Sequence, residues 1–91
     1  FMACSQGRDN VSTATAALDK RGRILAVKVD TVADMGAYLS QYSTFIPYVG
    51  ALMLAGVYAI PAMYVHLTYA YTNTVPVDAY RGAGRPEAAY L

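Results

Sequence analysis

Residues 72–87 read TNTVPVDAYRGAGRPE, a stretch with two prolines, two glycines, two arginines and two carboxylates behind a long apolar run. Gly82 and Gly84 can both adopt positive φ, so the backbone between them can turn tightly and leave its N–H groups free. Pro86 suits the first position of a helix, and Glu87 suits the positive end of the helix dipole. The stretch therefore predicts a glycine-rich loop that opens a helix, with a cation on each side, in an arrangement that favours anionic or electron-rich ligands.

Upstream of this stretch, the sequence predicts a β-hairpin formed by residues 8–18 and 23–33. The link at 19–22 (DKRG) is a short polar turn, with Gly22 where a left-handed residue is usual. The second strand alternates with the period of a β-strand. Its two faces carry Leu25, Val27 and Val29 on one side and Ala26, Lys28 and Asp30 on the other.

Residues 35–77 contain no Asp, Glu, Lys or Arg, and the part at 45–71 is long enough to cross a bilayer as a helix. Prolines and glycines interrupt that part, and its tyrosines are scattered instead of gathered at two interfaces. Residues 62–73 also alternate as a strand, and a segment that is half strand is poor membrane material. We therefore expect a short helix at 48–55, a turn at 57–61 and a buried strand at 62–73 that leads into the loop.

Strand pairs with short helices between them indicate an α+β fold. The 91 residues suffice for one small domain, but a piece of something larger is favoured. The chain begins at Phe1 without an initiator methionine, and it ends about one turn into the helix that Pro86 starts. A net charge of +1 without a basic stripe argues against nucleic acid. One cysteine, Cys4, excludes an internal disulfide and fits a reducing compartment.

The glycine-rich loop resembles a motif of the molybdenum hydroxylases, a family that includes xanthine dehydrogenase, aldehyde oxidase and the large subunit of aerobic carbon monoxide dehydrogenase. The resemblance rests on residues 73–74 (NT) and 79–88 (AYRGAGRPEA). Residues 7–9 (GRD), the hairpin after them and residues 30–38 (DTVADMGAY) are similar to the same family in the same order. Form II carbon monoxide dehydrogenase-like proteins are the most similar group. The resemblance implies that residues 1–91 are a slice of the molybdopterin-binding domain of a larger subunit.

The resemblance also implies roles for the loop. Arg81 would face the substrate beside molybdenum and stabilise negative charge on a substrate oxygen. The backbone of Gly82, Ala83 and Gly84 would approach the molybdenum centre closely. Arg85 would bond the cofactor or the loop. From spacing alone, a surface arginine paired with Asp78 or Glu87 and an ordinary tight turn explain the same residues.

Two positions depart from the family's patterns. True carbon monoxide dehydrogenases carry a copper-binding cysteine where this chain has Gly82, which offers no soft ligand for copper. The xanthine dehydrogenase version carries phenylalanine where this chain has Ala83. Carbon monoxide oxidation through copper is therefore disfavoured, and xanthine itself is not implied.

The function implied by the resemblance is oxidation of an aldehyde or an N-heterocycle with oxygen from water. The cofactor would be a molybdopterin dinucleotide, with cytosine as its base, and FAD and 2Fe–2S clusters would sit on a medium and a small partner subunit. A cytoplasmic dimer of heterotrimers is expected, without a membrane span. Carbon monoxide oxidation is the alternative reaction, and a non-enzymatic membrane or interaction module built on 45–71 is the alternative from another class.

Three other polar residues are weaker candidates. His66 has no partner at metal-binding spacing, so a strand histidine bonded to a neighbour is expected. Asp30 and Asp34 are better explained as turn and loop carboxylates than as an acid–base pair. In the family, the glutamate that acts as base lies far downstream of the segment that this chain resembles, so no base is assigned within residues 1–91.

Overall fold

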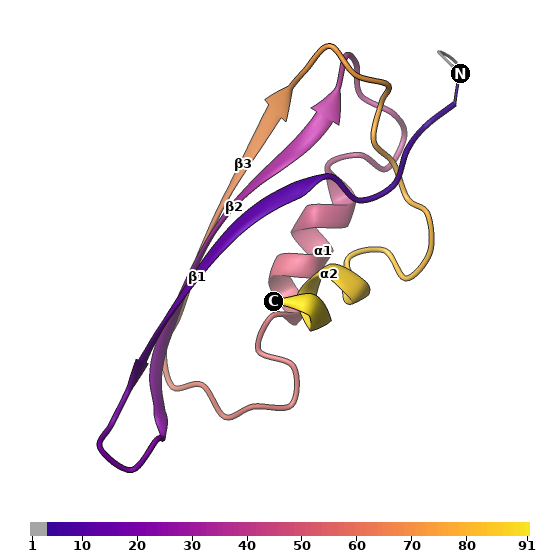
Figure 1. The fold of residues 1–91 in the computed structure, drawn as a ribbon. Helices are drawn as coiled ribbons and strands as arrows, with labels where there is room; N and C mark the ends of the chain where they lie inside the picture. The colour runs from indigo at the N-terminus through magenta and orange to yellow at the C-terminus, as the bar shows by residue number, and fades with distance from the viewer. Residues whose placement is uncertain (1–3) are drawn as a thin grey trace.

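The structure is a computed structural model, and it describes residues 4–91. Three strands and two helices follow one another along the chain, in the order β1 (Asn10–Leu18), β2 (Ile24–Gly36), α1 (Phe45–Met53), β3 (Met63–Tyr71) and α2 (Arg85–Tyr90). The strands form one sheet in the order β1-β2-β3, and both helices lie on the same side of it (Figure 1). The expected α+β class is confirmed.

The predicted hairpin is confirmed, with slightly different ends. β1 and β2 pair antiparallel from Asn10 opposite Ala33 to Ala17 opposite Ala26, and the register shifts before Leu18. The turn is held by the Asp19 carboxylate, whose Oδ1 accepts hydrogen bonds from the N–H groups of Arg21 (2.7 Å) and Arg23 (2.9 Å). An Asp side chain that bonds the backbone two residues on favours such a turn.

β3 pairs parallel to β2, from Met63 opposite Val27 to Tyr71 opposite Gly36, so the chain between them must cross over. The expectation of a buried strand is wrong for this chain. β3 is an edge strand, and its burial alternates, with Met63, Val65 and Leu67 half-buried and the residues between them exposed.

The helix between β2 and β3 begins and ends earlier than the expected 48–55. α1 begins at Phe45, which places Pro47 inside the first turn. Proline is tolerated there because the N–H that it lacks would have no partner within the helix. No helix among residues 4–91 is long and apolar enough to cross a membrane, and the 45–71 segment is divided between α1 and β3.

The core is small and lies on the helix-facing side of β2, where Val29, Ala33 and Met35 are almost fully buried. The hairpin end of the sheet extends well beyond the helices (Figure 1). The described chain is accordingly elongated, with extents of 51 × 21 × 15 Å. Many large apolar side chains remain exposed, among them Val57 (96%), Leu52 (68%) and Tyr58 (69%).

Candidate functional site

The segment that leads into the glycine-rich loop is fastened to the end of β2. The N–H of Thr72 donates to the Gly36 carbonyl (3.0 Å), and the N–H of Ala37 donates to the Thr74 carbonyl (3.0 Å). The Asp34 carboxylate completes this fastening by accepting from the Thr72 hydroxyl (2.7 Å), the Thr74 hydroxyl (3.0 Å) and the Gly36 N–H (2.8 Å). These bonds, first those from Gly36 and Thr72, hold the pKa of the Asp34 carboxyl below its usual range. Asp34 is therefore a structural carboxylate, although it lies in β2 and not in a loop.

The loop itself has the conformation that the two glycines predict, and more. Gly82 (φ 86°) and Gly84 (φ 89°) are left-handed, and so is Ala83 between them (φ 47°). A left-handed conformation is costly for an alanine and persists only where the surroundings impose it. Within residues 4–91, no hydrogen bond uses the N–H groups of residues 81–84. The N–H groups of residues 81–83 are thus left without a partner within the described residues, whereas Gly84 is buried.

Gly84 also explains why the loop sits where it does. It is buried against α1, and a Cβ on it would lie 2.5 Å from both the Gly50 nitrogen and the Ile46 carbonyl oxygen. Only a residue without a side chain allows the two backbones to approach this closely. The requirement for glycine at position 84 therefore comes from helix packing as well as from the turn.

The two arginines of the loop behave differently. Arg85 bonds the loop, because its Nη1 donates to the Gly82 carbonyl (3.1 Å), where its own N–H also donates (3.2 Å). Arg81 is exposed, and it takes part in none of the ion pairs formed within the described residues. The carboxylates proposed as its surface partners are occupied elsewhere, Asp78 by the Ser40 hydroxyl and Glu87 by Arg8.

Arg8 is the residue at this site that sequence reasoning missed. Its Nη2 donates to the Arg81 carbonyl (2.6 Å), its Nε lies 3.2 Å from Glu87 Oε1, and its Cζ lies 5.2 Å from the centre of the Tyr80 ring. The only signal in the sequence was that Arg8 belongs to the GRD segment of the resemblance. Sequence gave no reason to place an N-terminal arginine beside a loop so far along the chain.

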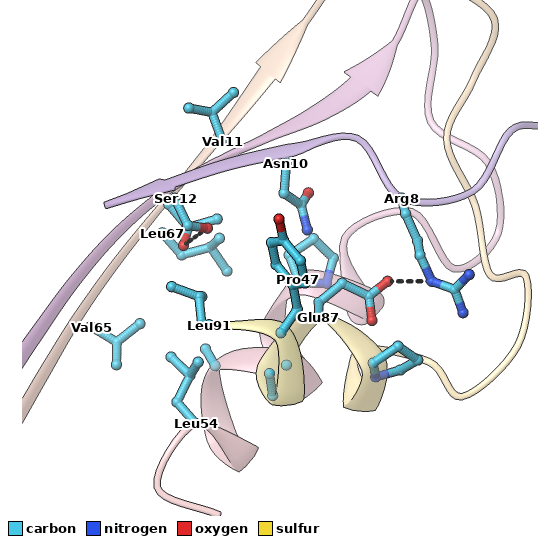
Figure 2. A pocket seen from close by; sticks show the side chains of 16 residues that line it. Arg8, Asn10, Val11, Ser12, Pro47, Leu54, Val65, Leu67, Glu87 and Leu91 are labelled. Carbon is cyan, nitrogen blue, oxygen red and sulfur yellow. Dashed lines mark hydrogen bonds and ion pairs between the residues drawn. The ribbon is translucent and has the colours of Figure 1, made fainter. Parts of the chain in front are cut away.

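A cavity lies beside the loop and not within it. It measures about 900 Å³ between the helix-facing side of the sheet and the two helices. Figure 2 shows its apolar side chains, including Leu54, Val65 and Leu67, gathered away from the Arg8–Glu87 pair. None of residues 81–85 lines it. The predicted site residues and this cavity are therefore separate features of the surface.

Polar residues on the other face of the sheet form a surface cluster. Asp30 Oδ2 lies 3.0 Å from Lys28 Nζ, and Asp30 Oδ1 lies 3.6 Å from His66 Nδ1. His66 lies beside Asp30, but 3.6 Å is longer than a hydrogen bond, so the expected bond to a neighbour is not formed within the described residues. Asp30 lies within β2 and not in a turn. In the part of the chain that the structure describes, no three His, Cys, Asp or Glu side chains come together in a way that could hold a metal ion.

A family model described as "Molybdopterin cofactor-binding domain" matches residues 1–91. The chain belongs to this family. The resemblance to molybdenum hydroxylases is thereby confirmed at the level of the cofactor-binding domain.

Two curated relatives carry related names. The chain is 36% identical over 86 residues to the 6-hydroxypseudooxynicotine dehydrogenase complex subunit gamma of Paenarthrobacter nicotinovorans, which covers 94% of this chain and 11% of the relative. It is 36% identical over 70 residues to the nicotinate dehydrogenase large molybdopterin subunit of Eubacterium barkeri, covering 77% of this chain and 16% of the relative. Both relatives are dehydrogenase subunits, and the chain spans only a small part of each.

A solved structure has the same local fold. Quinoline 2-oxidoreductase from Pseudomonas putida 86 superimposes with a TM-score of 0.85 at 29% identity, over 92% of this chain and 11% of that one. The three-stranded mixed sheet and its two helices therefore match one part of a much longer oxidoreductase chain.

Proposed function

We propose that this chain is part of the molybdopterin-binding large subunit of a molybdenum hydroxylase, which oxidises an N-heterocycle or an aldehyde with oxygen from water. The observation that carries the proposal is the left-handed run at 82–84, whose backbone N–H groups have no partner within residues 4–91, beside the exposed Arg81. Successive free N–H groups in such a turn form a concave surface for an anion or an electron-rich oxygen. Membership of the cofactor-binding family supports a molybdopterin cofactor as the ligand of that surface.

The residues of the loop fit a bulky anionic cofactor. Gly82 carries no side chain, and Ala83 carries only a methyl group, so little besides backbone stands between the loop and an approaching group. Gly84 fixes the end of the loop against α1, and Arg85 holds its beginning through the Gly82 carbonyl. When bound, the molybdopterin cofactor would supply the two-electron redox centre. The loop residues would bind and orient it through backbone donors.

Arg81 would act on the substrate and not on the cofactor. Its guanidinium is always charged and presents planar donors, so it can stabilise negative charge that develops on a substrate oxygen. Two facts support this role over a structural one. Its carbonyl is held by Arg8 while its side chain is in no ion pair of the described residues, and both nearby carboxylates are engaged by other groups. An arginine held by its backbone keeps its side chain available.

The relatives favour an N-heteroaromatic substrate. Nicotinate and quinoline, named in two of them, and the hydroxylated nicotine derivative named in the third all contain a nitrogen-bearing aromatic ring. Such rings have an electron-poor carbon beside nitrogen, which suits attack by a water-derived oxygen. We extend the proposal to molybdopterin cytosine dinucleotide as the cofactor, to partner subunits with FAD and 2Fe–2S clusters, and to a cytoplasmic dimer of heterotrimers.

Carbon monoxide oxidation, including a place among the form II carbon monoxide dehydrogenase-like proteins, is the less favoured alternative. A Cβ at position 82 would lie 2.8 Å from Pro86 Cδ and 2.9 Å from its Cγ, and φ there is +86°. A cysteine that binds copper would therefore need the loop to shift. The geometry at Gly82 thus adds a steric argument against copper chemistry to the absence of a thiol.

The test uses the full-length protein with its cofactor. Quinoline and nicotinate are supplied with an artificial electron acceptor in isotopically labelled water, and the product is analysed by mass spectrometry. We expect hydroxylation at a ring carbon with the label incorporated from water. Oxidation with oxygen from dioxygen, or a purified protein that holds no molybdopterin, would contradict the proposal. Oxidation of carbon monoxide alone would favour the alternative.

A further inference from the structure

We propose that Arg8 is a positioning residue that holds the Arg81 loop in its working conformation. The proposal rests on the proposed function, because it assigns to Arg8 the task of orienting the loop that would carry Arg81. Arg8 lies in the segment before β1, far from the loop in sequence. The Arg8 side chain contacts residues 80, 81 and 87, and these three contacts join the segment before β1 to the loop.

The segment before β1 is fixed in place beside the approach to the loop. The N–H of Gln6 donates to the Pro76 carbonyl (2.9 Å), and the N–H of Asp78 donates to the Gln6 carbonyl (2.8 Å). Gly7 lies so close to Tyr80 that a Cβ on it would be 2.8 Å from the tyrosine Cβ. The backbone next to Arg8 is therefore held against residues 76–80 independently of the contacts that the arginine side chain makes.

The conformation of Arg8 is itself strained. Its φ is +60°, and within residues 4–91 the only other positive φ outside glycine belongs to Ala83 in the loop. A left-handed conformation in a residue with a side chain persists when the surrounding contacts favour it strongly enough. The three side-chain contacts of Arg8 are such contacts. The hydrogen bond from Arg8 to the Arg81 carbonyl joins the first of these strained residues to the loop that contains the second.

Each of the three contacts uses a different part of the guanidinium. Nη2 bonds the Arg81 carbonyl, Nε pairs with Glu87, and the planar face covers the Tyr80 ring. A lysine has neither the planar face nor the fork of donors, so it can satisfy only part of this arrangement. Figure 2 shows the Arg8 side chain reaching toward Glu87 at the edge of the cavity.

Glu87 depends on Arg8. Its side chain is only 18% exposed, and its second oxygen, Oε2, is buried without a hydrogen-bond partner within the described residues. Without Arg8, the whole carboxylate would lack a cation at a half-buried position, and such a group is costly. Because Glu87 lies in the first turn of α2, its movement would carry the loop with it. Arg8 therefore controls both ends of the loop, at residue 81 and at residue 87.

The experiment compares Arg8→Gln and Arg8→Lys in the full-length protein with Arg23→Gln as the matched control. Arg23 also pairs with a carboxylate, Asp19, at 4.0 Å, but in the hairpin turn and with a side chain that is 70% exposed. We measure molybdenum content, kcat and KM, and hydrogen exchange of the hydrogen-bonded amides in residues 79–87, which are those of Ala79 and Arg85. The exchange measurement is made on the cofactor-free protein as well, so it does not depend on activity.

For Arg8→Gln we expect faster exchange at 79–87 and a kcat per molybdenum that falls by about ten- to hundredfold, with KM changed much less, because a small displacement of a catalytic group has effects of this size. Arg8→Lys should lie between Arg8→Gln and the wild type, and Arg23→Gln should match the wild type. Adding Arg8→Gln to Arg81→Ala should lower kcat no further, because the positioning residue acts through Arg81.

Unchanged exchange at 79–87 in both Arg8 variants would overturn the proposal, and so would a loss of molybdenum with normal kcat per metal. If Arg8→Gln does not accumulate in folded form, Arg8→Lys alone decides by the same two readings. Faster loop exchange in the Arg8 variants together with a normal kcat in Arg81→Ala would support the positioning role. The same result would remove Arg81 from the proposed reaction.

Discussion

At the scale of single residues, Arg81 and Arg8 contact each other through different parts: Arg81 through its backbone carbonyl and Arg8 through its side chain. The carbonyl of Arg81 accepts a hydrogen bond from Arg8, while the Arg81 guanidinium is exposed and in none of the ion pairs within the described residues. This division suits a residue whose side chain has to meet a ligand. We therefore expect substitutions of Arg81 to affect the reaction and substitutions of Arg8 to affect the conformation of the loop.

We predict that Arg81→Ala in the full-length protein lowers kcat by two to three powers of ten, equivalent to about 3–4 kcal/mol, with a smaller change in substrate binding. The reason is that a fixed cation stabilises charge only as it develops in the transition state. Arg81→Lys should restore part of the rate, because an ammonium lacks the planar pair of donors. Steady-state kinetics with molybdenum content measured on each variant checks this. Full molybdenum with an unchanged kcat would exclude the catalytic role.

A second prediction concerns Gly84, with Gly22 as its control. Both are left-handed, at φ 89° and 78°, but a Cβ at Gly84 meets the α1 backbone at 2.5 Å whereas nothing lies within 4 Å of a Cβ at Gly22. Gly22→Ala should cost about 1–2 kcal/mol, for the left-handed backbone alone. Gly84→Ala should cost about 1–3 kcal/mol more, for the overlap with α1.

Hydrogen exchange of amides in α1 and α2, and in the hairpin turn, measures the two local opening free energies separately. Equal costs at the two glycines would mean that α1 and the loop do not meet as described. A larger cost at Gly84, confined to the helices, would support the packing.

The sequence could predict the left-handed conformation of Gly82 and Gly84, because glycine before a helix that begins with proline has few alternatives. It could not predict that of Ala83, or the contact between Gly84 and Gly50, since both depend on where α1 lies. The role of Arg8 was beyond reach for the same reason. Contacts between distant segments leave no mark on the local pattern of either one.

At the scale of secondary structure, local patterns decided what was predictable. The hairpin was predicted because alternation and turn chemistry are both local, and the Asp19 side chain closes the turn from within it. The parallel pairing of β3 with β2 was not predicted, because its register is set across the intervening helix. α1 begins three residues before the expected residue 48, and Pro47 lies in its first turn, where proline is tolerated.

We predict a pH-dependent contribution from Asp34, which joins the end of β2 to residues 72–74. The folded pKa is lowered, chiefly by the Gly36 N–H and the Thr72 hydroxyl. Ionised Asp34 therefore stabilises the fold above the ordinary carboxyl pKa, and this stabilisation is lost as pH falls through the lowered pKa. In the full-length protein, the apparent melting temperature of Asp34→Asn should lie below that of the wild type at neutral pH, and the difference should shrink in acid.

Asp30→Asn is the control for Asp34, since Asp30 lies on the same strand, pairs with the exposed Lys28 (3.0 Å) and lies 3.6 Å from the exposed His66. Surface pairs of this kind contribute about 0–1 kcal/mol. Melting curves of both variants between neutral and acidic pH give the comparison. A difference for Asp34→Asn that grows toward acid would contradict the predicted sign.

At the scale of the whole chain, the apolar surface is larger than the core can cover. Three apolar side chains are almost fully buried among residues 4–91, while tyrosines, leucines and valines on both helices and all three strands are exposed. A core of this size is marginal even in a complete small domain. The elongated sheet adds to the difficulty, because the hairpin end has no helix against it.

We therefore predict that the 91-residue chain, produced alone, does not unfold cooperatively. Near-ultraviolet circular dichroism of the isolated chain should show a weak signal that declines gradually on heating. The full-length protein under the same conditions is the control, and it should show a sharp transition. A sigmoidal melt of the isolated monomeric chain would mean that the three-stranded sheet and its helices are stable without further cover.

The position of β2 in the middle of the sheet also has a consequence during synthesis on the ribosome. β1 pairs with one edge of β2 as soon as the hairpin has emerged, but the other edge waits for β3, which follows α1 in the chain. At about 5–20 residues per second, that wait is on the order of seconds. During it, the free N–H and C=O groups of β2 form an open sheet edge that other nascent chains can join. Chaperone binding to the nascent chain should therefore be strongest after β2 emerges and before β3 does.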